Sequence, residues 1–153
     1  LQMRACSALG LASVLAVAAC GDPLVPTLVA GSYELRSFDD AALPAVLYLT
    51  PTDTVQVSGW ALALRRDGSF REEVRFVLSS RASGVRRDSL ATEVGEYRVE
   101  GSQVSLFFDF CRDVPVCALI SYAPVEYRWS GRFLRSEGPG ARVFERIGGA
   151  TAP

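Results

Sequence analysis

Residues 56–78 read QVSGWALALRRDGSFREEVRFVL, and their pattern decides the fold class. Apolar side chains occupy alternate positions within 60–64 and again within 70–78, and the pair Asp67-Gly68 stands between the two segments. A period of two is typical of β-strands that bury one face, and an Asp-Gly pair tolerates the positive φ angles of a tight turn. The stretch therefore predicts an antiparallel hairpin.

The rest of the chain repeats this pattern in short segments separated by turn residues. No segment after residue 20 shows a clear helical period. About eight or nine successive strands favour an all-β fold, a small up-and-down antiparallel β-barrel of about eight strands, because closure leaves no exposed sheet edge. A two-sheet β-sandwich is the alternative, because alternation shows which face is buried but not whether the sheet closes. The further strands are expected at 33–36, 45–49, 93–100, 104–110, 125–129, 132–135 and 141–147, with a polar loop at 79–89.

The composition excludes several classes of chemistry. The 153 residues include no histidine, and all 16 basic residues are arginine. Without histidine the chain has no Ser-His-Asp or Cys-His nucleophile and no imidazole ligand for a metal, so we expect no enzyme, no cofactor and no metal site. Asp39, Asp40 and Asp53 do not follow a calcium-loop pattern, which favours a solvated turn. A net charge of −1 argues against nucleic acid as a partner.

The first twenty residues have the organisation of an export signal. Arg4 precedes an apolar run at 8–19 that is too short to span a membrane. The run ends in Val17-Ala18-Ala19-Cys20-Gly21, which resembles the lipobox of bacterial lipoproteins. The resemblance implies that Cys20 receives a diacylglycerol, with acyl chains such as palmitate, and becomes the first residue of the mature chain. The alternatives are an ordinary signal peptide, in which Cys20 is incidental, and a buried N-terminal helix.

Lipidation implies both a domain organisation and a location. The chain would consist of a signal peptide (1–19), the lipidated cysteine with a tether (20–30), a folded domain (31–147) and a tail (148–153). Two or three acyl chains anchor a protein stably, so we expect the membrane to be a partner through the anchor. The expected location is the bacterial cell envelope. Glycine rather than aspartate follows the cysteine, which favours the outer membrane.

The remaining cysteines support an exported protein. Cys111 and Cys117 have five residues between them and lie outside the export signal. In an oxidising compartment such a pair is expected to form a disulfide that closes a local loop. The alternatives are a redox pair, which prefers two intervening residues, and a metal site, which lacks further ligands here.

The two ends of the predicted barrel carry a second resemblance. Gly31-Ser32-Tyr33-Glu34-Leu35 is similar to the Gly-x-Trp opening strand of lipocalins, with tyrosine in place of tryptophan. Val143-Phe144-Glu145-Arg146 is similar to the closing strand, in which lipocalins place an arginine against that ring. The domain thus resembles the bacterial lipocalin-like lipoproteins. The resemblance implies that Tyr33 and Arg146 form a cation–π contact that closes one end of the barrel.

Strand parity provides the candidate ligand-binding residues. Glu72 shares the parity of its apolar neighbours, so alternation directs its carboxylate into the barrel. We interpret it as a solvated or arginine-paired group near the open end, in preference to a titrating or ligand-binding group. Phe107 has the opposite strand parity to Leu106 and Phe108, so its side chain is expected on the outer surface of the barrel. The aromatic residues are interpreted mainly as core, and those that could line a pocket with Glu72 are Trp60, Phe76, Phe108, Tyr127 and Trp129.

Three functions are compatible with these observations. The leading hypothesis is a non-enzymatic, lipid-anchored envelope protein, monomeric, that binds a small apolar or amphipathic ligand inside the barrel. The alternative is a barrel filled by its own side chains, which contacts another envelope protein through the loops at 39–44, 79–89 and 111–117. A carboxylate-pair enzyme is the third, but no convincing pair of acidic groups supports it.

Overall fold

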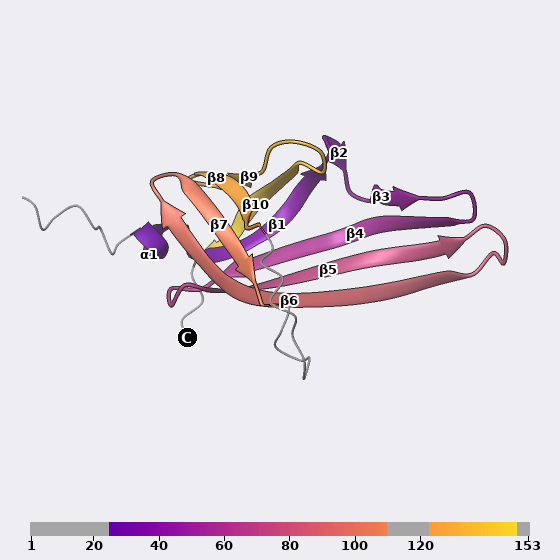
Figure 1. Ribbon diagram of the computed structural model, residues 1–153, viewed down its shortest axis with the longest axis horizontal. Coiled ribbons are helices and arrows are strands. Elements are labelled where there is room, and N and C mark those ends of the chain that lie inside the picture. The colour runs from indigo at the N-terminus through magenta and orange to yellow at the C-terminus, as the bar shows by residue number, and fades with distance from the viewer. Residues whose placement is uncertain (1–24, 110–122, 150–153) are drawn as a thin grey trace, which may run out of the picture.

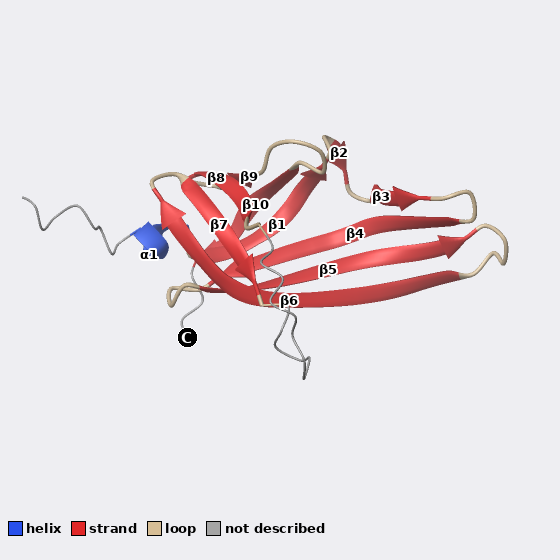
Figure 2. Cartoon of the chain, viewed as in Figure 1, coloured by secondary structure: helices blue, strands red, loops and turns tan. Residues whose placement is uncertain are grey.

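The computed structural model describes residues 25–109 and 123–149 of the chain (Figure 1). Within these residues the structure consists of ten β-strands and one five-residue helix, α1 (Val25–Val29). Figure 2 shows how completely strands dominate the fold. The predicted all-β class is confirmed.

Eight of the strands form a closed antiparallel barrel. Each barrel strand pairs with the next one along the chain, and β1 closes the barrel by pairing with both β4 and β10. The predicted up-and-down barrel is confirmed and the sandwich alternative is excluded. The barrel strands are β1 (Gly31–Phe38), β4 (Asp53–Leu64), β5 (Ser69–Ser80), β6 (Arg86–Glu100), β7 (Gln103–Phe108), β8 (Val125–Ser130), β9 (Phe133–Arg135) and β10 (Arg142–Gly149). The other two strands, β2 (Ala41–Ala42) and β3 (Ala45–Leu49), extend the sheet from β1 and β4.

The hairpin predicted around Asp67-Gly68 joins β4 to β5. Gly68 has a φ of 84°, which costs glycine little because it has no Cβ. The Asp67 carboxylate accepts hydrogen bonds from the backbone N–H of Ser69 at 2.9 Å and from its hydroxyl at 2.7 Å. The turn therefore fixes the register of the two longest apolar stripes in the barrel.

The barrel interior is filled by side chains. Its aromatic rings contact one another edge to face: the centroids of Phe144 and Trp60 lie 6.0 Å apart, and those of Phe70 and Phe108 lie 5.0 Å apart. Such contacts add to the free energy of apolar burial. The largest fully buried side chains are Tyr33, Tyr127, Phe70, Phe144, Leu62, Leu106, Leu134 and Glu72.

Strands β4, β5 and β6 continue beyond the barrel and, with β3 added at the edge, form a four-stranded sheet, which we call the wing (Figure 1). The wing comprises β3 and residues 53–59, 75–80 and 86–92. Val57 pairs with Phe76, and Val55 pairs with Leu78, so these residues continue the inner face of the barrel. Beyond the barrel no opposite wall covers this face among the described residues, and Leu78 is 40% exposed.

The wing corrects one prediction, the polar loop at 79–89. β5 extends to Ser80 and β6 begins at Arg86, so the connection is only 81–85. Residues 86–90 are exposed on both faces of the sheet. A strand without a core on either face needs no apolar alternation, which is why the sequence in this segment resembles a loop.

Gly95 lies where β6 passes from the wing into the barrel. A Cβ at this position would lie 2.0 Å from the carbonyl oxygen of Phe107 and 2.7 Å from the ring of Phe70. The close approach of backbone and ring requires glycine.

We therefore expect Gly95→Ala to lower the free energy of unfolding by about 1–3 kcal/mol, the usual cost of overpacking. Gly59→Ala is the matched control, because its Cβ would meet Arg75 only at 3.8 Å, an ordinary contact. Urea denaturation of both variants measures the difference. Equal stabilities would contradict the account of Gly95.

The end of the barrel opposite the wing is covered by α1. Val29 and Ala30 are fully buried, so the last part of the expected tether belongs to the folded domain. Tyr33 donates a hydrogen bond to the carbonyl oxygen of Val29 at 2.5 Å. Arg146 donates to the carbonyl oxygens of Leu28, at 3.1 Å, and of Ala30. β10 likewise continues to Gly149, two residues into the expected tail.

Candidate functional site

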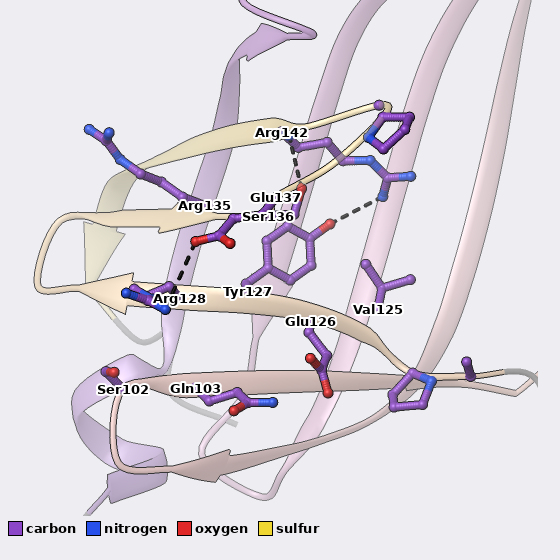
Figure 3. Close-up of a pocket in the computed structure, with 14 residues that line it drawn as sticks. Ser102, Gln103, Val125, Glu126, Tyr127, Arg128, Arg135, Ser136, Glu137 and Arg142 are labelled. Atoms are coloured by element: carbon purple, nitrogen blue, oxygen red, sulfur yellow. Dashed lines mark hydrogen bonds and ion pairs between the residues drawn. The ribbon is translucent and has the colours of Figure 1, made fainter.

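A groove of about 620 Å³ opens in the barrel wall beside β8 (Figure 3). β9 has three residues and pairs only with 128–130 of β8, so the first half of β8 has no paired strand on that side in the described structure. Residues 136–141 connect β9 to β10 above the gap. The groove is lined by Ser102, Gln103, Ala123, Pro124, Val125, Glu126, Tyr127, Arg128, Arg135, Ser136, Glu137, Pro139, Gly140 and Arg142.

Asp39 holds the connection above the groove in place. Its carboxylate accepts hydrogen bonds from the backbone N–H groups of Gly140, at 2.8 Å, and Ala141, at 3.2 Å. Its own N–H donates to the carbonyl oxygen of Ala141 at 2.8 Å. Asp39 has a φ of 47°, a conformation that aspartate adopts more readily than most residues. Asp39 and Asp40 are exposed and lie in a turn, as predicted, and the side chain of Asp39 in addition joins β1 to the β9–β10 connection.

We expect Asp39→Ala to cost about 1–2 kcal/mol of stability, because it leaves the two N–H groups without their acceptor and keeps a strained φ. Asp39→Asn retains both the acceptor oxygen and the tolerance of positive φ, so it should lose clearly less. Thermal unfolding followed by circular dichroism compares the two. An equal loss of stability in both variants would contradict the role given to the Asp39 hydrogen bonds.

Arg142 and Tyr127 form the floor of the groove. Arg142 Nη1 donates a hydrogen bond to the Tyr127 hydroxyl at 3.1 Å, as the dashed line in Figure 3 marks. The guanidinium carbon lies 4.2 Å from the centroid of the Trp60 ring, a cation–π contact. Burial raises the pKa of Tyr127 to about 12, so the hydroxyl stays protonated. The arginine is thus held between an aromatic face and a neutral hydroxyl.

Glu72 lies behind this layer, inside the barrel. Its side chain is fully buried, and its carboxylate accepts a hydrogen bond from Trp60 Nε1 at 2.6 Å. Desolvation raises the pKa of Glu72 to about 7, although the Trp60 hydrogen bond and the charge of Arg142 act to lower it. The preferred interpretation of Glu72 as a solvated or arginine-paired group is wrong: the carboxylate is buried, and its hydrogen-bond donor is an indole.

The rim of the groove carries balanced charge. Glu126 and Glu137 oppose Arg128 and Arg135 among the lining residues. Arg128 and Glu137 approach to 3.9 Å, but both side chains are largely exposed. Such pairs contribute little to stability because water and salt screen them. The unbalanced charge of the groove therefore comes from Arg142 on its floor.

The structure divides the six candidate ligand-binding residues among different places. Trp60, Glu72 and Tyr127 lie together around Arg142. Phe76 lies on the inner face of the wing. Phe108 packs on Phe70 in another part of the barrel, and Trp129 donates to the Gly131 carbonyl oxygen at 3.1 Å in the β8–β9 turn. Phe107 lies outside, 36% exposed, with Arg98 over its ring at 5.0 Å.

Tyr33 and Arg146, the pair expected to close the barrel, are register neighbours on β1 and β10. The guanidinium carbon of Arg146 lies 6.0 Å from the centroid of the Tyr33 ring. Arg146 combines this contact with its hydrogen bonds to the chain around α1, so it holds the end of the barrel mainly by donating to backbone carbonyl groups.

Sequence reasoning missed Arg142. Arg142, Phe144 and Arg146 stand at alternate positions of β10, so the parity that directs Phe144 inward also directs Arg142 inward. The predicted sites at Cys20, Cys111 and Cys117 lie outside the described residues.

No protein-family model matches the chain, and no curated protein matches it. In the part of the chain that the structure describes, no group of three or more acidic, cysteine or histidine side chains could hold a metal ion. No helix among those same residues is long and apolar enough to cross a membrane.

Proposed function

We propose that this protein is a non-enzymatic, lipid-anchored interaction module of the bacterial cell envelope, whose wing receives an extended strand of a partner protein. The observation that carries the proposal is the edge strand β3. It reads Ala-Val-Leu-Tyr-Leu and contains no charged residue and no proline. Val46, Leu47, Tyr48 and Leu49 are between 45% and 59% exposed.

An edge of this kind is unusual for a protein that acts alone. β3 is the last strand in the sheet, so its outer backbone groups face no further strand among the described residues. Natural sheets protect such edges with charges, prolines or covering segments, and an uncovered apolar edge favours pairing with another strand. An added strand gains backbone hydrogen bonds and places alternate side chains against the apolar surface. The partner segment is therefore expected to be extended and apolar.

The filled barrel favours this module over the ligand carrier. A carrier of apolar ligands needs an internal cavity, but here Tyr33, Phe70, Leu106 and Phe144 are fully buried and occupy the interior. Small barrels commonly fill their interiors in this way. The recognition surface then has to lie outside the barrel, where the wing offers it.

The arrangement of the molecule suits an anchored module. α1 lies at one end of the barrel and the wing projects from the other (Figure 1). The proposed lipid on Cys20 lies five positions before Val25, the first residue of α1. Lipidation would hold the α1 end toward the membrane and direct the wing away from it.

A photo-crosslinking amino acid in place of Tyr48 tests the strand-docking proposal in cells. We expect one discrete adduct with another envelope protein. The adduct should disappear when Val46 and Leu49 are both replaced by lysine, because charges on an edge oppose strand addition. Ile147 is the control position, because it is exposed to a similar extent, 52%, at the other end of the molecule.

Several results would overturn strand docking. They are the absence of an adduct at position 48, an adduct that survives the lysine substitutions, and the same adduct from position 147. An adduct between two copies of this chain would replace the partner protein with a homodimer and would also overturn the proposal.

The anchor is tested separately. Cys20→Ser should move the protein from the membrane fraction to the soluble fraction, because no acyl chain can then be attached. Fractionation followed by immunoblotting measures the change, and Cys6→Ser is the control. Persistence of the Cys20→Ser protein in the membrane fraction would contradict lipidation.

A further inference from the structure

The guanidinium group of Arg142 uses only some of its hydrogen-bond donors within the described structure. Nη1 donates to the Tyr127 hydroxyl, whereas Nε and Nη2 donate to no acceptor among the residues that the structure describes. The Trp60 ring covers one face of the group and so limits its freedom to turn. An arginine held in one orientation loses little further entropy when an acceptor binds it.

The groove above these donors has the volume of a small-molecule site. Its volume of about 620 Å³ lies in the usual range for ligand pockets. Pro124, Val125 and Pro139 provide apolar wall, and Arg142 provides a convergent polar group on the floor. A carboxylate matches the paired N–H groups of a guanidinium, with one oxygen on each donor.

The charges around the groove limit the ligand to a single negative charge. Glu126 and Glu137 stand on the rim, where they disfavour a multiply charged anion such as phosphate. Arg128 and Arg135 balance them, so that the charge left over among the lining residues is the single positive charge of Arg142.

We propose that this groove binds a small organic monocarboxylate, whose two oxygens accept hydrogen bonds from Nε and Nη2 of Arg142. The apolar body of the ligand lies against the proline and valine side chains. The site is separate from the wing, so this proposal stands or falls independently of strand docking.

Protonation of Glu72 couples to this site. The groups that face Glu72 are Trp60 on β4, Arg142 on β10, Tyr127 on β8 and Glu93 on β6. When Glu72 is ionised, its charge already compensates part of the charge of Arg142. When Glu72 is protonated, that compensation is lost and Arg142 attracts a carboxylate more strongly. Binding should therefore be tighter at pH 6 than at pH 8, by at least about fivefold.

Tryptophan fluorescence provides the readout. The chain has two tryptophans, so Trp129→Phe leaves Trp60, which contacts Arg142, as the only indole. Cyclohexanecarboxylate is the probe and cyclohexanecarboxamide is its neutral counterpart. We expect a saturable change with the carboxylate and none with the carboxamide. Glu72→Gln should keep the binding but remove its pH dependence.

Substitution of the arginine identifies the donor. Arg142→Gln should abolish binding, and Arg142→Lys should weaken it at least about tenfold, because an ammonium keeps the charge without the paired donors. The Nε–H resonance of Arg142 in the unsubstituted protein gives a second measurement that does not depend on how the variants fold. It should shift with the carboxylate alone.

Several results would overturn the proposal. They are equal responses to the carboxylate and the carboxamide, binding that survives in folded Arg142→Gln, and an Nε–H resonance that stays in place at millimolar carboxylate. The double substitution of Val46 and Leu49 by lysine should leave the titration unchanged, which separates this site from the wing.

Discussion

Glu72→Gln should make the protein more stable at pH 8.5, by about 2–3 kcal/mol, although the substitution lies in the core. Burial raises the pKa of Glu72 from 4.5 to about 7, so at alkaline pH the folded protein holds an ionised carboxylate away from water. Glutamine has no charge to bury, and its amide oxygen can still accept the hydrogen bond from Trp60 Nε1.

The sign of the pH dependence follows from the two protonation states. Below pH 4.5 the carboxyl is protonated in both the folded and the unfolded chain and carries no penalty. Between pH 4.5 and 7 the folded protein binds more protons than the unfolded chain, so stability falls as the pH rises. Above pH 7 the full penalty of about 3 kcal/mol is present.

Urea denaturation from pH 4.5 to 8.5 measures this difference. The unsubstituted protein should lose stability across the range relative to Glu72→Gln, and the two should converge at the acid end. Glu73→Gln is the control, because Glu73 is partly exposed and pairs with Arg71 at 2.9 Å on the outside of the barrel. Parallel stability curves for the Glu72→Gln variant and the unsubstituted protein would show that Glu72 is not buried in its charged form.

Phe144→Ala should have the largest effect of any single truncation, a loss of about 3–5 kcal/mol. The Phe144 side chain has no exposed surface. Its ring meets those of Trp60 and Tyr127 edge to face, with centroids 6.0 and 5.8 Å away. Alanine would leave a cavity between β10, β4 and β8. The Trp60 and Tyr127 rings are held by their own hydrogen bonds, so they cannot move into the space.

Chemical denaturation quantifies this loss. Ile147→Ala is the matched control on the same strand, because Ile147 is 52% exposed and should lose well under about 1 kcal/mol. If Phe144→Ala lost no more than the control, the ring would not be a centre of the core.

The barrel was predictable because its strands are covered on one side only. Alternation in 60–64 and 70–78 identified the inner face, and Asp67-Gly68 identified the turn. The same rule failed at 86–89, where the residues are all polar and both faces of β6 are exposed. Hydrogen bonds to β5 form that strand, and backbone pairing leaves no trace in the identity of the side chains.

The candidate site was predictable only in part, for a related reason. Parity directed Glu72 inward, but its environment depends on Trp60, which approaches it across the β4–β5 pair. Asp39 acts on a connection 101 residues further along the chain. Contacts of this range depend on how the barrel closes, and no local pattern encodes them.

Closure of the barrel by its first and last strands also bears on when the protein can fold. Gly31 pairs with Gly149 across almost the whole domain, and β1 lies between β4 and β10. Until β10 has been synthesised, the sheet has an open seam and the β1–β10 contacts cannot form. Folds that depend on such distant contacts form slowly. The barrel can therefore close only after the last strand has been made, and the β1–β10 pairs are among the last contacts that the chain can form.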